Sequence, residues 1–314
     1  MANSKEMVKM SPLDLAKLYI GGLSHTHTVL SNHKGHLESD LSVDKIMEVL
    51  NKAGLIRGEN AAIKFVLFNE HPSNPANPKR LGRLSPRARK LLRQRRRPFV
   101  RTVPMLYGLE VSILQDGSTD LSPRLSDNSS LVIASRHQLP QKVEHEIASI
   151  KRMFTAACQN PAIDVIGHPA RYIENVEIDW PEMFAEAAES GTGIEINYNS
   201  FPDFYDFEDR KEFWQKWLRQ LAQSDAPIFI GSDIHNRLQL DRFCSDWRNL
   251  DEPDMQNNGL ARFLVALAEA GVRPDQVINA KKESFFEWMR LDKPNRAKLC
   301  LSNKNSGKLK GGSK

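Results

Sequence analysis

Short apolar runs alternate with longer amphipathic stretches along most of the chain. The runs lie at 18–23, 63–68, 105–114, 131–134, 163–166, 194–197 and 227–230. Apolar residues at helical spacing fill much of the sequence between and after them, at 43–53, 142–158, 181–189, 207–221, 259–270 and 282–289. A continuous apolar run is typical of a strand buried on both faces of a parallel sheet, and intervening helices favour crossover connections. The pattern predicts an α/β fold of about seven strand–helix units, as in an α/β barrel.

Residues that favour helix ends support several of these boundaries. Ser42 directly precedes the stretch 43–53, and Gly54 follows it. Asp179 stands just before Pro181, which opens the stretch 181–189. Ser and Asp side chains accept hydrogen bonds from the first turn of a helix, and Pro is tolerated there because its missing N–H is not needed. Both stretches are therefore predicted to be helices.

Histidines and acids gather where the predicted strands end. His25 and His27 follow the first run, His168 follows the run 163–166, and Asp233 and His235 follow the last run. Side chains two positions apart on a strand share a face, and imidazole and carboxylate groups are the usual ligands of zinc and related metals. In barrels of this kind, the C-terminal ends of the strands form the active site. The pattern predicts a metal site at that end.

Composition fits an ordinary globular enzyme. The chain has 314 residues, 40% of them hydrophobic and 26% charged. We expect an N-terminal arm at 1–16, a single barrel domain at 17–292 with a basic insertion at 79–101, and a mostly disordered basic tail at 293–314. No segment approaches the roughly 18 apolar residues that a membrane helix needs, and the first ten residues lack an apolar signal-peptide region. The three cysteines are widely spaced. We therefore expect a cytoplasmic protein with no membrane partner.

Positive charge is concentrated in the segment 79–101. It contains 11 Lys and Arg and no acid, and the rest of the chain has 33 basic and 39 acidic residues, a net charge of −6. Such asymmetry favours a polyanionic partner, and Arg93 and Arg96 are predicted to contact phosphates of a nucleic acid. The alternative is a solvated helix face at 86–97. Phe99 is the one aromatic residue of the segment, so binding should depend little on base sequence.

The strand-end motifs resemble those of the polymerase-and-histidinol-phosphatase (PHP) family of metal phosphoesterases, in particular its compact bacterial stand-alone members. The resemblance covers roughly residues 19–289. It implies a distorted (β/α)7 barrel with a trinuclear metal site at the C-terminal ends of the strands. Nine residues match the ligands of the family, in order: His25, His27, His33, His71, Glu110, His137, His168, Asp233 and His235. Two positions depart from the family pattern: Leu23 replaces an acid, and Asn69-Glu70 replaces Thr-Asp.

The resemblance also implies how these residues divide among three divalent cations, which could be Zn, Mn or Fe. One cation would take His25, His27, Glu110 and Asp233. Glu110 would bridge to a second cation, held by His137 and His168. The third would take His33, His71 and His235.

We hypothesise a metal-dependent phosphoesterase that acts on DNA or RNA as a nuclease. Glu110 would bridge metals, and the leaving group would take its proton from His33, from His235 or from water. Arg171 and Arg136 could bind phosphate, although both also fit surface salt bridges. Two alternatives stay open: a small-molecule phosphomonoesterase of the histidinol-phosphatase type, and a non-catalytic scaffold or nucleic-acid-binding subunit.

Overall fold

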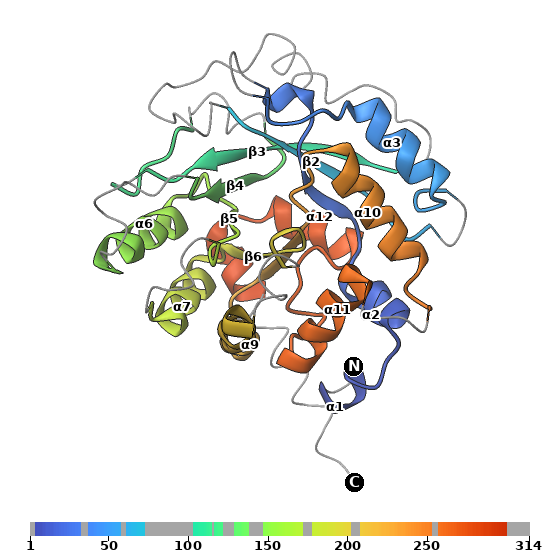
Figure 1. Ribbon diagram of the computed structural model, residues 1–314. Helices are drawn as coiled ribbons and strands as arrows, with labels where there is room; N and C mark the ends of the chain where they lie inside the picture. Colours follow the sequence, from blue (N-terminus) through green and yellow to red (C-terminus); the bar gives the residue numbers. More distant parts are fainter. Residues whose placement is uncertain are drawn as a thin grey trace.

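Seven parallel strands form the centre of the molecule (Figure 1). The computed structural model describes residues 4–32, 37–57, 61–72, 103–114, 116–121, 129–137, 147–171, 178–201, 208–252 and 257–299. The strands pair in chain order: β1 (Leu23–Thr26), β2 (Val66–Glu70), β3 (Met105–Ser112), β4 (Val132–Ser135), β5 (Val165–Gly167), β6 (Gly193–Asn197) and β7 (Ile228–Gly231).

The two edges of this sheet meet, so the predicted seven-stranded barrel is confirmed and nearly closed. The backbone N–H of Ser232, just past β7, donates to Ser24 O of β1 over 2.8 Å. The N–H of His27 donates to Ile234 O, also over 2.8 Å. These bonds bring the ends of β1 and β7 side by side, and with them the His-x-His and Asp-x-His motifs.

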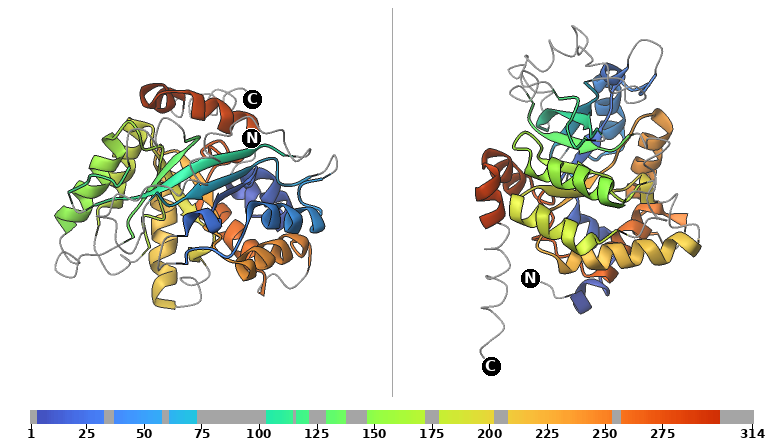
Figure 2. Two further views of the ribbon diagram at one scale, coloured as in Figure 1. Left: turned by 90° about the horizontal axis from the view of Figure 1, so that it is seen from above. Right: turned by 90° about the vertical axis from the view of Figure 1, so that its left-hand side faces the viewer.

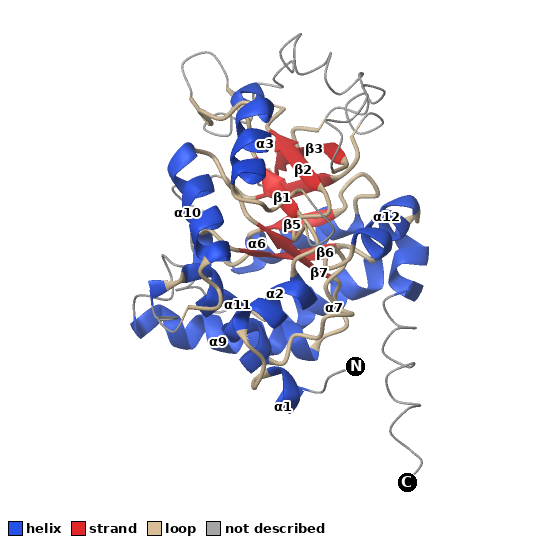
Figure 3. Ribbon diagram, turned by 90° about the vertical axis from the view of Figure 1, so that its right-hand side faces the viewer, coloured by secondary structure: helices blue, strands red, loops and turns tan. Residues whose placement is uncertain are grey.

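Helices surround the sheet, as the views in Figures 2 and 3 show. None of the described helices is long and apolar enough to cross a bilayer. The predicted N-caps are confirmed: Ser42 Oγ accepts from Lys45 N–H (3.2 Å) and Asp179 Oδ1 from Glu182 N–H (3.3 Å). The helical elements are α1 (Ser4–Met7), α2 (Pro12–Tyr19), η1 (Val29–Ser31), α3 (Val43–Lys52), α6 (Ile147–Gln159), α7 (Trp180–Ser190), α9 (Glu208–Gln223), α10 (Arg237–Arg248), α11 (Gly259–Ala270) and α12 (Lys282–Arg290).

The first strand begins later than predicted. Residues 18 and 19 end helix α2, and β1 starts only at Leu23. Ser11 caps this helix and Pro12 opens it, so the local start signal outweighs the β-prone composition that follows. Tyr19 is fully buried, and its hydroxyl donates to Val272 O over 2.6 Å. Residues 4–16, predicted as an N-terminal arm, contain α1 and the first part of α2.

The first residues of the predicted C-terminal tail pack against the barrel. Lys293 Nζ donates to Thr192 Oγ1 over 2.8 Å, and the Arg296 guanidinium contacts Asp164 and lies 4.1 Å from the centre of the Trp288 ring. Polar partners on the barrel thus hold residues that composition alone assigns to a tail. The remainder of that tail, the basic insertion at 79–101 and the helix predicted at 86–97 lie outside the described residues.

An apolar plug closes one end of the barrel. Phe285 and Trp288 of α12 pack against Phe65, which directly precedes β2, and against Phe229 of β7. The Phe65 and Phe285 rings stack with centroids 4.9 Å apart. In Figure 3, α12 stands to one side of the strands. The strands therefore run from this plug toward the opposite end, where the predicted ligands lie.

Candidate metal centre

All seven strands deliver a polar side chain to the end of the barrel opposite the plug. Eight of the nine predicted ligands lie within the described residues, and the structure brings all eight together; His33 lies outside those residues. Six of the eight are buried, and His137 and His235 are partly buried. They come from β1 and its end (His25, His27), the end of β2 (His71), β3 (Glu110), the ends of β4 and β5 (His137, His168) and the end of β7 (Asp233, His235).

Glu110 is the centre of the cluster. Its Oε2 lies 3.2 Å from the Nε2 atoms of both His25 and His27, and 3.3 Å from His71 Nε2. Its Oε1 lies 3.2 Å from His137 Nε2 and 3.0 Å from His168 Nε2. The two carboxylate oxygens therefore face two separate groups of imidazoles.

Asp233 completes the first of these groups. Its Oδ1 lies 3.6 Å from His25 Nε2 and 3.3 Å from His27 Nε2. The ligand atoms of His25, His27, Glu110 and Asp233 all lie within 4.8 Å of one another, a spacing at which one ion could contact all four. The same holds for His71, Glu110 and His137.

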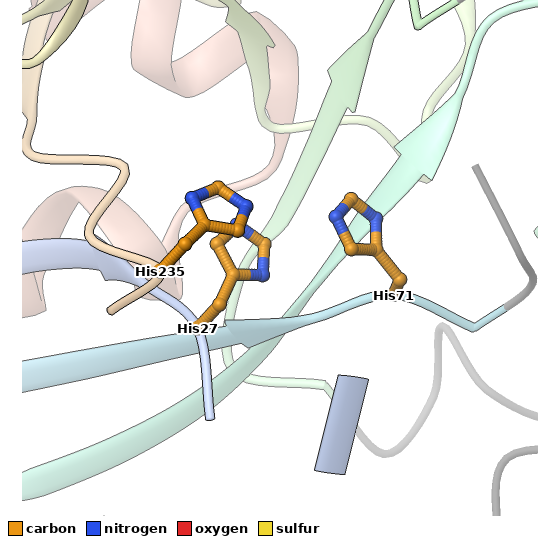
Figure 4. Close-up of side chains that lie close together, drawn as sticks. All are labelled: His27, His71 and His235. Atoms are coloured by element: carbon orange, nitrogen blue, oxygen red, sulfur yellow. The ribbon is translucent and has the colours of Figure 1, made fainter. Parts of the chain in front are cut away.

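Three histidines form a further group (Figure 4). The ligand atoms of His27, His71 and His235 also lie within 4.8 Å of one another. The His27 ring stacks on that of His235 with centroids 4.2 Å apart, and on that of His71 at 4.6 Å. His27 and His71 thus each belong to two groups, so the geometry divides the residues less sharply than the resemblance implies.

Hydrogen bonds on the outer nitrogen fix the orientation of several rings. Nδ1 of His25 bonds to Glu195 Oε1 (2.6 Å), and Nδ1 of His235 bonds to Asp233 O (2.9 Å). Nδ1 of His137 bonds to Ser112 Oγ over 3.1 Å. A ring whose Nδ1–H is bonded to the protein presents the Nε2 lone pair, which is the arrangement that ligating histidines require.

Glu70, one of the two departures from the family pattern, has a defined role in this arrangement. Ser31 Oγ donates to Glu70 Oε2 over 2.6 Å. The same hydroxyl accepts from His71 N–H (3.1 Å) and lies 3.2 Å from Nδ1 of His27. Because its own proton goes to Glu70, it accepts from His27 Nδ1–H. Glu70 therefore sets the tautomer of His27 through Ser31.

Glu195 of β6 is the site residue that the sequence analysis missed. Its Oε1 accepts from His25 Nδ1–H, and its Oε2 accepts from the backbone N–H of His168 over 2.8 Å. A side chain at Gly231 would put its Cβ 1.7 Å from Glu195 Oε1, so only glycine leaves room for this carboxylate. The signal was a single acid inside an otherwise apolar buried strand, where an unpartnered charge would be costly.

The residues present fit divalent cations. Four buried atoms at the centre make no hydrogen bond with the described residues, although carboxylates and imidazoles surround them: His25 Nε2, His27 Nε2, His137 Nε2 and Asp233 Oδ1. Facing lone pairs repel unless a cation lies between them. His25, His168 and Asp233 also hold positive φ angles of 56°, 28° and 51°. Strained backbone of this kind is typical of functional sites.

The pKa values of His25 and His27 also indicate that the cluster favours positive charge. Burial opposes charge on His25, but the carboxylates of Glu195, Glu110 and Asp233 raise its pKa well above the ordinary value. Burial likewise opposes charge on His27, yet Asp233 and Glu110 raise its pKa to about 9. For His71 burial prevails and lowers the pKa to about 4. Without a metal, protons would take the place of the missing positive charge.

The two predicted phosphate-binding arginines differ in exposure. Arg171 Nη1 donates to Asp233 Oδ2 over 3.0 Å, and its side chain is 31% exposed. Arg136 is 5% exposed, and its Nη2 donates to the carbonyl of Arg171 over 3.2 Å. Arg171 therefore lies at the cluster, and Arg136 supports its backbone. Arg93 and Arg96 lie outside the described residues.

No family model matches the chain. A probable phosphatase of Thermoanaerobacter sp. (strain X514) is 26% identical over 192 residues, which are 61% of this chain and 70% of that protein. A probable phosphatase of Caldanaerobacter subterraneus subsp. tengcongensis is 25% identical over 236 residues, 74% of this chain and 83% of that protein. The DNA polymerase/3'-5' exonuclease PolX of Bacillus subtilis (strain 168) is 29% identical over 141 residues, 44% of this chain and 23% of PolX.

Among solved structures, histidinol phosphate phosphatase of Lactococcus lactis subsp. lactis Il1403, complexed with zinc, L-histidinol and phosphate, has a TM-score of 0.49 at 17% identity. That match covers 79% of this chain and 94% of the other. The names of the curated relatives agree with the motifs at the strand ends, and together they support a PHP-type phosphoesterase.

Proposed function

We propose that this polar end of the barrel binds divalent cations and hydrolyses phosphate esters. The observation that carries the proposal is the position of Glu110, whose two oxygens face separate groups of imidazoles at 3.0–3.3 Å. Two atoms that each lie about 2.1 Å from a tetrahedral ion are about 3.4 Å apart. The spacing of these groups is therefore that of ligands around cations on both sides of one bridging carboxylate.

The proposed cations occupy three places. His25, His27, Glu110 and Asp233 would hold the first, and Glu110 with His137 and His168 the second. His71 and His235 would hold the third, to which the resemblance adds His33. Imidazole-rich sites of this kind accept zinc, manganese or iron, and carboxylates at the same site favour the harder of these ions.

When bound, such cations would polarise the phosphoryl oxygens, lower the pKa of water and stabilise the leaving oxygen. Both oxygens of Glu110 are engaged, which supports a bridging role rather than proton transfer. The Arg171 guanidinium, at Asp233 and partly exposed, is placed to donate to a phosphate at the cluster. His235 Nε2 faces the other ligands, so we assign the leaving-group proton to solvent.

A small phosphomonoester is the substrate class that we favour. The relatives that share most of their length with this chain are named probable phosphatases. Glu110, His25 and His27 are at most 1% exposed, so the reacting phosphate must enter deeply. A terminal phosphate carries a substituent on one side only, and it therefore reaches such a site more easily than an internal phosphodiester does.

The test compares turnover of p-nitrophenyl phosphate by the full chain with zinc, with manganese, and after chelation. We expect turnover that chelation abolishes and added metal restores. Turnover that survives complete removal of metal would contradict the proposal. Inactivity of metal-loaded protein on several monoesters would exclude the substrate class.

Nucleic acid remains the second candidate because of the basic segment 79–101, with 11 Lys and Arg and no acid. A labelled oligonucleotide offered beside p-nitrophenyl phosphate distinguishes the two substrates. Replacing Arg93, Arg95, Arg96 and Arg97 by Ala should weaken oligonucleotide cleavage at moderate salt and spare the small ester. An equal effect on both substrates would assign the segment a structural role.

A further inference from the structure

Glu38 brings an additional carboxylate to the rim of the metal centre. Its Oε1 lies 3.0 Å from His235 Nε2 and 3.6 Å from His71 Nε2, and its side chain is 14% exposed. The family motifs assign it no role. It is nevertheless close to the two histidines that the third proposed cation would use.

Hydrogen bonds on both sides fix the backbone at this position. Asn32 Oδ1 accepts from the N–H groups of Glu38 (2.7 Å) and Ser39 (2.8 Å), and Asn32 Nδ2 donates to Ser39 O over 2.8 Å. Further along, the N–H of Arg237 donates to Asp40 Oδ1 over 3.0 Å. Glu38 is thus anchored to the turn that follows β1 and to the first turn of α10, next to His235.

The atoms that meet at this point favour a cation between them. Nδ1 of His235 bonds to the Asp233 carbonyl, so Nδ1 carries a proton, and in the neutral ring Nε2 then carries a lone pair. Glu38 Oε1, also electron-rich, faces that lone pair at 3.0 Å. A carboxylate that merely oriented the ring would bond to Nδ1, as Glu195 does on His25. Two facing lone pairs call for a cation between them.

The distances agree with shared coordination. Ligand atoms about 2.1 Å from a tetrahedral ion are about 3.4 Å apart, and 3.0 and 3.6 Å bracket that value. We infer that Glu38 is a metal ligand, which donates an anionic oxygen to the cation held by His71 and His235. The inference rests on the metal-dependent function proposed above. A carboxylate would give an otherwise imidazole-bound ion a harder, negatively charged ligand and so a tighter hold.

The test titrates metal-free full chain with Zn²⁺ alone and with Mn²⁺ alone, by calorimetry and by metal analysis after desalting. We expect Glu38→Gln to lose one equivalent, or to weaken one binding step by about tenfold or more. The matched control is Glu48→Gln on the exposed face of α3, where Glu48 pairs only with Lys45 and Lys52 among the described residues. This control should bind metal as the wild type does.

A second variant guards against a folding defect. Glu38→His places a neutral ligand of similar reach where the carboxylate was, and it should recover the lost equivalent. Circular dichroism should match the wild type for all variants. If Glu38→Gln binds the same number of ions as wild type with unchanged affinity, the inference fails while the proposed function stands. If the wild type binds no metal, both fail.

Discussion

The two ends of the barrel are equally buried but chemically opposite. At the plug, Phe285 and Trp288 are 0% and 1% exposed; at the metal centre, His25 and Glu110 are also 0% and 1% exposed. Burying a large apolar side chain stabilises a fold by about 1.5–3 kcal/mol. A buried polar group without a partner costs about 1–3 kcal/mol, and a charged one costs more.

This difference distinguishes an end that stabilises the fold from an end that fits the proposed function. Among the described non-glycine residues, positive φ angles occur only at His25, His168 and Asp233, all at the polar end. The plug stabilises the fold. At the candidate metal centre, facing lone pairs and strained backbone destabilise it, and the stability gained at the plug offsets this cost. Substitutions at the two ends should therefore separate stability from metal binding.

The largest effect is expected from removing a ligand. Asp233→Ala or His168→Ala should lower phosphoester turnover by about 10³-fold or more, since the cations contribute several kcal/mol of transition-state stabilisation. Metal content should fall, and circular dichroism should show an intact fold. Full turnover in both variants would contradict the assignment of Asp233 and His168 as metal ligands.

Substitution at the plug should do the reverse. Phe285→Ala removes a fully buried ring stacked on Phe65 and should lower the free energy of unfolding by about 3–5 kcal/mol. Urea denaturation measures this loss, and metal analysis under native conditions should find an unchanged number of ions. Loss of metal without loss of stability would show that the two ends are not separate in function.

A smaller effect is expected at Glu195, which contacts His25 and the backbone of His168 but no cation in our account. In Glu195→Gln, the amide NH₂ would face a donor at one of these two contacts, so metal affinity should weaken about 10–100-fold. Calorimetric titration measures the change, with Glu189→Gln on the exposed face of α7 as the matched control. Equal affinities for the two variants would make Glu195 a purely structural residue.

The smallest effect, taken per pH unit, is a dependence of metal affinity on pH. The pKa of His27 is raised to about 9 in the metal-free protein, so below that pH a cation must displace its proton. Fewer protons compete as pH rises, so affinity should increase by about tenfold per unit toward pH 9 for this one proton, and then level off. Calorimetry in buffers of different ionisation enthalpy detects the released proton. Binding without proton release at pH 7 would contradict the raised pKa.

Much of the fold could be predicted because a buried parallel strand requires a short, continuous apolar run in the sequence. Runs such as 131–134 are apolar on both faces, and Ser42 and Asp179 mark helix starts by their own hydrogen bonds. Helix α10 was missed because it is mostly polar. Its signals were the Asn236–Gln239 capping box and the buried residues that recur at helical spacing behind it: Leu240, Phe243, Cys244 and Trp247.

The candidate ligands could be predicted, but the residues that orient them by hydrogen bonds could not. Histidines at strand ends stand out by residue type, whereas Ser31, Glu70 and Glu195 make contacts with residues 27 to 170 positions away. No local pattern encodes such contacts, because they depend on how the barrel closes. Glu38 belongs to the same class, since the fold alone brings it to His71 and His235.

Anomalous X-ray scattering from crystals of the full chain grown with Zn²⁺ or Mn²⁺ tests the central claim most directly. Our account predicts peaks at the metal edge on both sides of the Glu110 carboxylate, each about 2.0–2.3 Å from its ligand atoms. A further peak should lie among His71, His235 and Glu38. Absence of any peak at Glu110 in excess metal, or peaks confined to the surface, would contradict the account.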